Sequence, residues 1–149
     1  MLTKLLPDQV SRFWPIIKYA VEESLPPIVG EHPDKMNRIL SAMLSGSLEV
    51  WASYKKESNK FEAILVTQFL YDDASNTRNL LLYCLYGYDP INPDSWTEGF
   101  ESLFKYAKSK GCHSIIAYSA NPYIVELAKK YDGNVDYTFI SLEINKIVL

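Results

Sequence analysis

Leu80-Leu-Leu-Tyr-Cys-Leu-Tyr86 is an almost unbroken apolar run, and it decides the fold. A run of this length is too short for a typical helix. Bounded by turn residues, it is typical of a strand that is covered on both faces. Gly87 follows and ends the strand. The segment therefore predicts a central strand of a buried sheet.

A long helix is predicted directly after this strand. Asn92-Pro93-Asp94 combines a preferred N-cap residue, a proline at the first helical position and an acid in the first turn. Apolar residues then recur on one helix face as far as Ala107. Gly111 is the expected left-handed stop.

The same pattern follows a second time. Ser114–Tyr118 is a second apolar strand, and Asn121-Pro122 repeats the cap of a helix. A strand, a crossover helix and a returning strand favour a right-handed parallel connection. We therefore expect a parallel pair of strands inside the sheet.

The amino-terminal half predicts helices followed by an antiparallel hairpin. A helix opens at Pro7, and Pro15 predicts a kink or a late start near Trp14. A second helix runs from Pro33 to Gly46. Strands are expected around Leu48–Ser53 and over Phe61–Tyr71, joined by a polar turn, and one last strand is expected from about 137 to 144.

The sum is an α/β (α+β) fold. It has a twisted, mixed antiparallel and parallel sheet of about six strands with helices on both faces. At 149 residues we expect a single domain over residues 1–149. The last strand can be truncated, or it can complete itself with another copy of the chain.

Composition excludes several classes of function. The net charge of −3 and the absence of a Lys/Arg cluster argue against a nucleic-acid binder. No signal peptide and no run long enough for a membrane helix are visible, so a cytoplasmic protein without membrane partners is expected. Cys84 and Cys112 have no metal-site spacing and are expected in the core. His32 and His113 likewise form no metal constellation.

The order of elements and the segment Asn121-Pro-Tyr-Ile-Val-Glu-Leu127, followed by an aromatic final strand, resemble the GNAT (Gcn5-related) N-acetyltransferase family. The resemblance implies acetyl-CoA as the cofactor of an active member and a small-molecule amine as its acceptor. In that family, backbone amides between the central strand and its helix cradle the coenzyme A pyrophosphate through a Q/R-x-x-G-x-G/A signature.

This sequence departs from the family pattern at both functional positions. The stretch from Gly87 to Gly99 lacks the glycine signature and carries Asp89, Asp94 and Glu98, whose charges oppose a pyrophosphate. The family places a general-acid tyrosine seven residues after an asparagine in the last helix, and here that position is Ala128. Tyr131 is a displaced substitute. No general base is visible in the central strand.

The resemblance nevertheless implies a cofactor gap between the two parallel strands. Tyr86, Gly87, Tyr118, Ser119 and Asn121 would line it and bind the cofactor. The alternative is that the tyrosines pack in the core with their hydroxyls at the rim, and that Asn121 only caps a helix.

Three hypotheses about function follow. The first is a degenerate acetyltransferase homologue with a binding or accessory role, of the divergent kind found in phages and mobile elements. The second is an active acyl-CoA-dependent N-acyltransferase with a non-standard cofactor loop, in which Tyr131 or Tyr88 protonates the leaving thiolate. The third is an interaction protein that forms a homodimer or binds a protein partner through an open sheet edge.

Overall fold

Five strands form one mixed sheet in the order β1-β2-β3-β4-β5. The computed structural model describes residues 1–55, 57–58 and 60–149. The strands are β1 (Leu2–Lys4), β2 (Glu49–Tyr54), β3 (Phe61–Asp72), β4 (Thr77–Gly87) and β5 (Ser114–Ala117). The helices are α1 (Pro7–Arg12), α2 (Trp14–Glu22), α3 (Lys35–Ser45), α4 (Pro93–Ser109) and α5 (Pro122–Lys130), followed by the 3-10 helix η1 (Ile144–Lys146). The chain divides into two units, Met1–Ala117 and Tyr118–Leu149, and each is described by itself.

The predicted mixed sheet is confirmed, with one strand fewer than expected. Neighbouring strands from β1 to β4 are antiparallel, and β4 pairs with β5 in parallel. The hairpin of β2 and β3 is present where the sequence predicts it, although Lys56 and Asn59 of its turn lie outside the described residues. The sequence did not reveal β1, because three residues are too few to show a period of two.

The expected last strand is absent from the described structure. Residues 134–143 carry no strand pairing, and Ile144–Lys146 form a 3-10 helix instead. An alternating apolar pattern such as Tyr137 to Ile144 is a necessary feature of a strand, but a strand also needs a partner for its backbone groups. The sequence pattern alone could not supply that partner, so the expected strand near 137–144 was wrong and the sheet has five strands where about six were expected.

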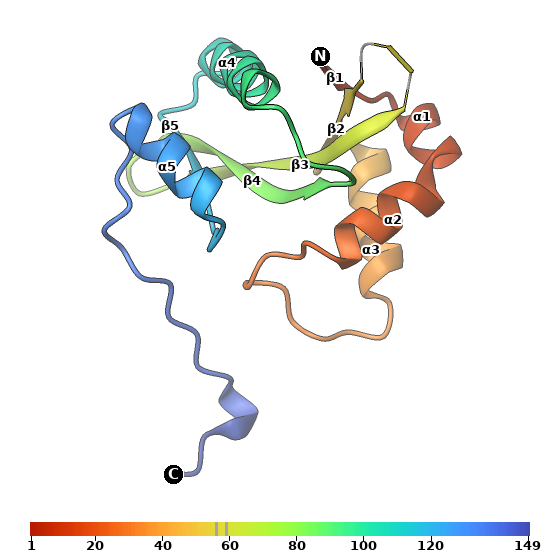
Figure 1. Cartoon of the computed structure of the whole chain (residues 1–149). Helices are drawn as coiled ribbons and strands as arrows, with labels where there is room; N and C mark the ends of the chain where they lie inside the picture. The colour runs from red at the N-terminus through yellow and green to blue at the C-terminus, as the bar shows by residue number, and fades with distance from the viewer. Residues whose placement is uncertain (56, 59) are drawn as a thin grey trace. The chain divides into compact units, whose positions relative to one another are not determined.

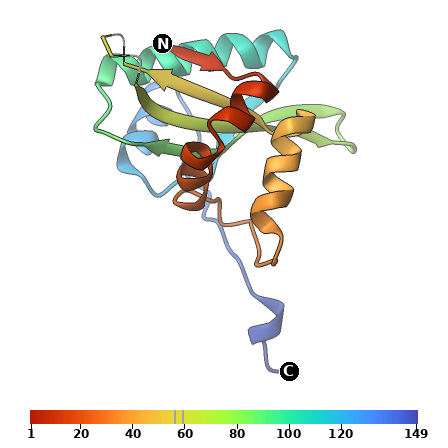
Figure 2. The same cartoon turned by 90° about the vertical axis from the view of Figure 1, so that its right-hand side faces the viewer.

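The amino-terminal helices cover one face of the sheet. The predicted break near Trp14 is confirmed, because α1 ends at Arg12 and α2 begins at Trp14. Buried residues of α1, α2 and α3 pack with Ile64, Val66 and Cys84 of the sheet in one apolar cluster. Figures 1 and 2 show these three helices on the side of the sheet opposite to α4.

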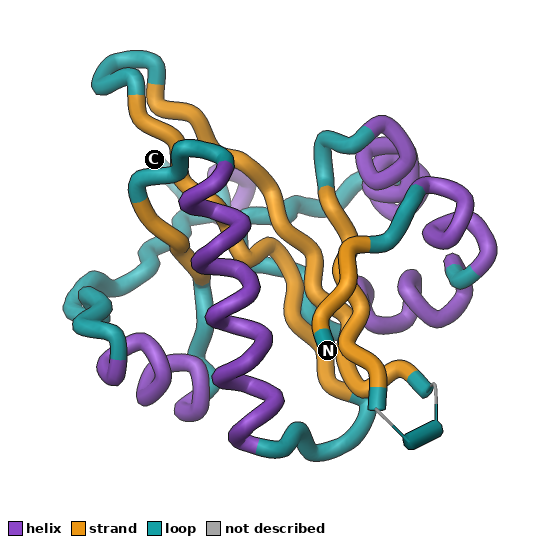
Figure 3. Tube along the Cα trace, turned by 90° about the horizontal axis from the view of Figure 1, so that it is seen from above, coloured by secondary structure: helices purple, strands orange, loops and turns teal. Residues whose placement is uncertain are grey.

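Helix α4 covers the other face and lies across the strands in Figure 3. Leu103 and Ala107 of α4 pack with Leu65, Leu80 and Leu82 in a second apolar cluster. The helix has the caps that the sequence predicts, since Asn92 is its N-cap and Gly111 adopts a φ of +71° just beyond its end. The sheet therefore has helices on both faces, as expected.

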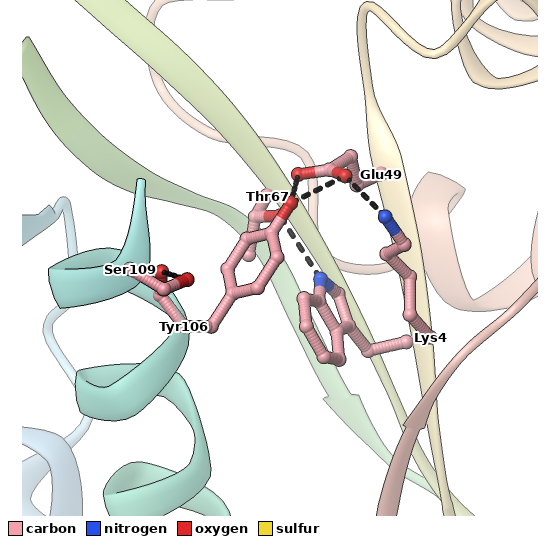
Figure 4. A network of polar contacts seen from close by, with 6 residues as sticks. Lys4, Glu49, Thr67, Tyr106 and Ser109 are labelled. Atoms are coloured by element: carbon pink, nitrogen blue, oxygen red, sulfur yellow. Dashed lines mark hydrogen bonds and ion pairs between the residues drawn. The ribbon is translucent and has the colours of Figure 1, made fainter. Parts of the chain in front are cut away.

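A polar network ties α4 to the first two strands (Figure 4). The hydroxyl of Tyr106 donates to both carboxylate oxygens of Glu49 at 2.6 Å, and Lys4 forms an ion pair with Glu49 at 2.9 Å. Below it, the indole N–H of Trp51 donates to Thr67 at 3.0 Å within the core. Burial, followed by the bond to Glu49, raises the pKa of Tyr106. These contacts account for polar groups that would otherwise be costly to bury.

The core position predicted for Cys84 is confirmed, whereas Cys112 is only half-buried and lies between α4 and β5 and not in a strand. Both thiols are free, and Cys84 is buried in the core beneath the amino-terminal helices. Burial raises the pKa of Cys84 to about 12 and also raises the pKa of Cys112. The Cys84 thiol is therefore protonated at neutral pH and is a poor nucleophile.

Candidate functional site

The carboxyl-terminal half of β4 lacks a strand partner on one edge in the described part of the chain. The register places Val66 opposite Cys84 but Thr67 opposite Leu82, so Tyr83 is an extra residue in a β-bulge. Strand β5 pairs only with Asn79–Leu82. Within the described residues, β4 beyond the bulge pairs with β3 only, which makes its other edge a candidate place for a ligand to add backbone hydrogen bonds.

Aromatic side chains gather at this end of β4. The rings of Tyr86 and Tyr88 are 5.2 Å apart with an interplanar angle of 80°, and the rings of Tyr86 and Tyr19 are 5.6 Å apart at 90°. The hydrogen bond with Tyr19, followed by burial, raises the pKa of Tyr86. We call Tyr19, Tyr86 and Tyr88 the tyrosine cluster. It lies on the face of the sheet that α2 covers.

Tyr88, one of the predicted acids, is held by two backbone contacts. Its hydroxyl donates to the carbonyl of Ile16 at 2.9 Å, and its amide donates to the carbonyl of Glu62 at 3.0 Å. Burial raises the pKa of Tyr88 to about 12. The proton that a thiolate would need is thus already engaged by α2, and the hydroxyl is a weaker acid than an exposed tyrosine.

The remaining predicted site residues belong to the second unit. Asn121 caps α5 by accepting from the amide of Tyr123 at 3.0 Å, and Ser119 accepts from the amide of Asn121 at 3.1 Å. Tyr118 packs edge to face against Phe139 at 5.0 Å. Tyr131 is the C-cap residue of α5. The capping role of Asn121 is confirmed, while the meeting of these four residues with Tyr86 and Gly87 stays a prediction.

The N-terminus of α4 is the position where the resemblance implies a pyrophosphate, and here one of its backbone donors is missing and a second is already bound. Pro93 is the first helical residue and has no N–H. The next amide, that of Asp94, donates to the side-chain oxygen of Asn92 at 2.8 Å. The amide of Trp96 donates to the carbonyl of Asn92 at 3.1 Å. The Asp94 carboxylate stands in the same turn. The residues present do not fit a pyrophosphate.

Asp89 is one of the three acids whose charges were expected to oppose a pyrophosphate, and the structure changes that expectation for Asp89. Asp89 forms an ion pair with Lys55 at 2.7 Å, and this contact lowers the pKa of Asp89. Its charge is therefore compensated, although only weakly because both groups are exposed to solvent. The opposition to an anion rests mainly on Asp94, which belongs to the first turn of α4.

A buried carboxylate at this end of the sheet escaped the sequence analysis. Glu62 is only 6% exposed, and Ser53 donates to its Oε2 at 3.0 Å. The register opposes Tyr54 to Phe61 but Ser53 to Ala63, which makes Glu62 the extra residue of a second bulge. The signal was an acid next to the apolar run Ala63-Ile-Leu-Val66. Among the described residues, no group of three or more His, Cys, Asp or Glu could hold a metal ion.

Comparison with solved structures finds the same fold in several acetyltransferases. A probable acetyltransferase matches with a TM-score of 0.71 and 10% identity over 97% of both chains. A predicted acetyltransferase with acetyl-CoA from Clostridium acetobutylicum matches with a TM-score of 0.69 and 17% identity, over 99% of this chain and 97% of that one. Glucosamine-6-phosphate N-acetyltransferase from Arabidopsis thaliana matches with a TM-score of 0.66 and 11% identity over 97% of both chains.

Sequence comparison finds nothing equivalent: no family model and no curated protein matches the chain. Identities of this size establish the fold alone. No helix of the described structure has the length and apolar character that crossing a membrane requires.

Proposed function

We propose that this chain, which has the fold of the Gcn5-related N-acetyltransferases, acts as a binding or accessory protein and has lost efficient acetyl-CoA chemistry. One observation carries the proposal: the α4 N-terminus has a proline without a donor, an amide already bound by Asn92, and the Asp94 carboxylate. A helix N-terminus binds phosphate through free amides and a positive field. At the N-terminus of α4, the number of free amides and the positive field are both reduced.

The size of the effect supports this reading. Two like charges at ~4 Å repel by about 1 kcal/mol in water and by about 4 kcal/mol in the less polar surroundings of a protein surface. A lost charge-assisted hydrogen bond removes roughly 1.5–3 kcal/mol more. Since about 1.4 kcal/mol is tenfold in affinity, these terms together weaken coenzyme A binding by orders of magnitude.

A second function is favoured by a different observation. The bulge at Tyr83 and the edge of β4 that follows it, which lacks a strand partner in the described residues, could still receive an amide-containing ligand arm. Solved structures of the same fold include a predicted acetyltransferase with acetyl-CoA. The alternative is therefore an acyl-CoA-dependent N-acyltransferase that acts on a small-molecule amine, with Tyr131 or Tyr88 as its acid and a cofactor held by the strand alone.

Calorimetry separates the binding protein from the acyltransferase. The purified protein is titrated with acetyl-CoA and with free coenzyme A, at low and at moderate salt. The proposal expects no binding at millimolar ligand. Micromolar binding of acetyl-CoA together with turnover of any amine in a screen would overturn it and establish the alternative. Micromolar binding without turnover would leave a binding protein, but one whose cofactor site is intact, and would contradict the argument from α4.

A further inference from the structure

A pocket lies between the sheet and α4, within the first unit of the chain. Its empty volume is about 540 Å³, including space open to solvent. Strands β1 to β4 line it on one side, and the first half of α4 lines it on the other. Most of the lining side chains are apolar, among them Leu65, Leu82, Leu85, Trp96, Phe100 and Leu103. Small-molecule sites in proteins are typically concave and mostly apolar in this way.

Gly99 is the residue of α4 that leaves this space open. It follows Trp96 by three positions and precedes Leu103 by four, so these residues share the helix face that packs on the sheet. A Cβ added to Gly99 would meet no atom within 4 Å. Position 99 therefore belongs to the apolar face of α4, and it has room for a side chain that the sequence does not provide.

Two common reasons for a glycine do not apply to Gly99. It lies within α4 and is not one of the glycines with positive φ, and no neighbouring atom approaches the place of its Cβ. Glycine inside a helix is less favourable than alanine, and unfilled space beneath a helix loses packing contacts. The sequence thus keeps the pocket open at the expense of stability, which is a common feature of binding sites.

The lining suits an uncharged ligand. Among the described lining residues, the charged groups are the N-terminal ammonium of Met1 and the carboxylate of Glu98. They are of opposite sign and both residues are exposed, so solvent screens them and they favour neither a cation nor an anion. Moving an ion from water to apolar side chains is costly unless an opposite charge pairs with it.

We infer that the pocket binds a compact, uncharged apolar molecule in the space that Gly99 leaves open, against Leu65, Leu82 and Leu103. The inference goes beyond the proposed function, because it requires neither coenzyme A nor the tyrosine cluster. A binding or accessory protein would thereby have a small-molecule ligand of defined chemistry.

The test uses three probes that share a phenyl ring and differ in charge at neutral pH: benzyl alcohol, benzylamine and benzoate. Each is titrated into the full chain without coenzyme A and followed by heteronuclear NMR. We expect benzyl alcohol to bind about tenfold or more tightly than either ion, with shifts at Leu65, Leu82 and Trp96. Ile39, in the apolar cluster beneath the amino-terminal helices, should not shift. Absence of alcohol binding, equal binding of an ion, or equal shifts at Ile39 would overturn the inference.

Substitutions at position 99 assign the site. Gly99→Leu fills the pocket from α4 and abolishes binding of benzyl alcohol. Gly99→Ala adds one methyl group, keeps most of the binding and raises the midpoint of thermal unfolding, because alanine favours the helix and the space accepts it. Glu101→Leu is the matched control: it adds the same side chain as Gly99→Leu at an exposed position of α4 and leaves binding unchanged.

Circular dichroism confirms that each variant is folded. Binding that survives in folded Gly99→Leu, or that is lost equally in Glu101→Leu, contradicts the assignment to this pocket. If Gly99→Leu does not fold, Gly99→Ala and the map of NMR shifts decide. A lower midpoint for Gly99→Ala, or shifts away from the lining residues, would then count against the pocket. Failure of this inference leaves the coenzyme A titration unaffected.

Discussion

The side-chain oxygen of Asn92 accepts a hydrogen bond from the backbone amide of Asp94 at 2.8 Å. Asn92 thereby satisfies a donor that the first turn of α4 would otherwise leave open. The resemblance to the GNAT family implies a phosphate next to this donor in a member that binds coenzyme A. The contact therefore serves the stability of the helix at the expense of anion binding, and both consequences can be measured.

The first consequence is structural. Replacing Asn92 with Ala removes the acceptor and lowers the free energy of unfolding by about 1 kcal/mol. Asn92→Asp keeps an acceptor and adds a charge that the helix N-terminus favours, so it has no such cost. Urea denaturation followed by circular dichroism measures both. An Ala variant as stable as the parent would show that the cap contributes nothing here.

The second consequence concerns the lost cofactor. The double variant Asn92→Gly/Asp94→Ser frees an amide and removes the carboxylate, while Gly remains an acceptable N-cap. Affinity for coenzyme A rises about fivefold or more, since roughly 1 kcal/mol of repulsion disappears. Calorimetry at low salt tests whether the double variant binds coenzyme A at millimolar concentrations, at which the parent is expected not to bind. Asp8→Ser is the control, because it removes an acid from the first turn of α1 and changes the net charge equally.

If the double variant gains no affinity, the α4 N-terminus does not limit coenzyme A binding. If Asp8→Ser gains as much affinity, net charge alone explains the effect. Either result would remove the observation that carries the proposed function.

The Tyr106–Glu49 contact predicts a larger effect on stability. Tyr106→Phe keeps the ring between Trp51 and Phe69 but removes the hydroxyl from Glu49, whose side chain is 13% exposed and also pairs with Lys4. Hydrogen bonds to charged groups contribute roughly 1.5–3 kcal/mol, and we expect a loss in this range. Thermal denaturation measures it. Tyr71→Phe is the control, since its hydroxyl bonds Asn76 on an exposed hairpin and its removal costs less.

Local signals in the sequence predicted most of the fold. Asn-Pro pairs marked the starts of α4 and α5, and a positive-φ glycine marked the ends of α3 and α4. These signals act within one turn of the chain, so a single sequence contains them. The bulge at Tyr83 depends on the register against β3, and the strand expected near the C-terminus depended on a partner. Neither can be deduced from local pattern.

The residues of the candidate site also fall into those that the sequence predicted and those that it missed. The sequence placed Tyr86, Gly87 and Tyr88 at the end of the central strand, which the structure confirms. It missed Tyr19 because that residue reaches Tyr86 only when α2 packs on β4. It missed Glu62 because this acid is buried at a β-bulge, and a bulge leaves no periodic pattern in the sequence. Contacts between distant segments are the part that sequence reasoning could not supply.

The contact between Tyr88 and Ile16 yields a prediction about pH. The ordinary pKa of tyrosine is 10.0, and burial raises that of Tyr88 to about 12. Between these values the unfolded chain has lost the proton and the folded chain has kept it. The contribution of Tyr88 to the free energy of unfolding is therefore fully present below pH ~10 and is lost as pH rises toward ~12.

Tyr88→Phe removes both the hydrogen bond and the titrating group. At pH 8 the variant is less stable than the parent by roughly 0.5–1.5 kcal/mol. The difference shrinks as pH rises from ~10 to ~12, because only the parent loses stability through this group. Urea denaturation at matched pH values measures it. A difference that grows with pH would mean that the Tyr88 phenolate is favoured in the folded chain, as an acid poised to give up its proton requires.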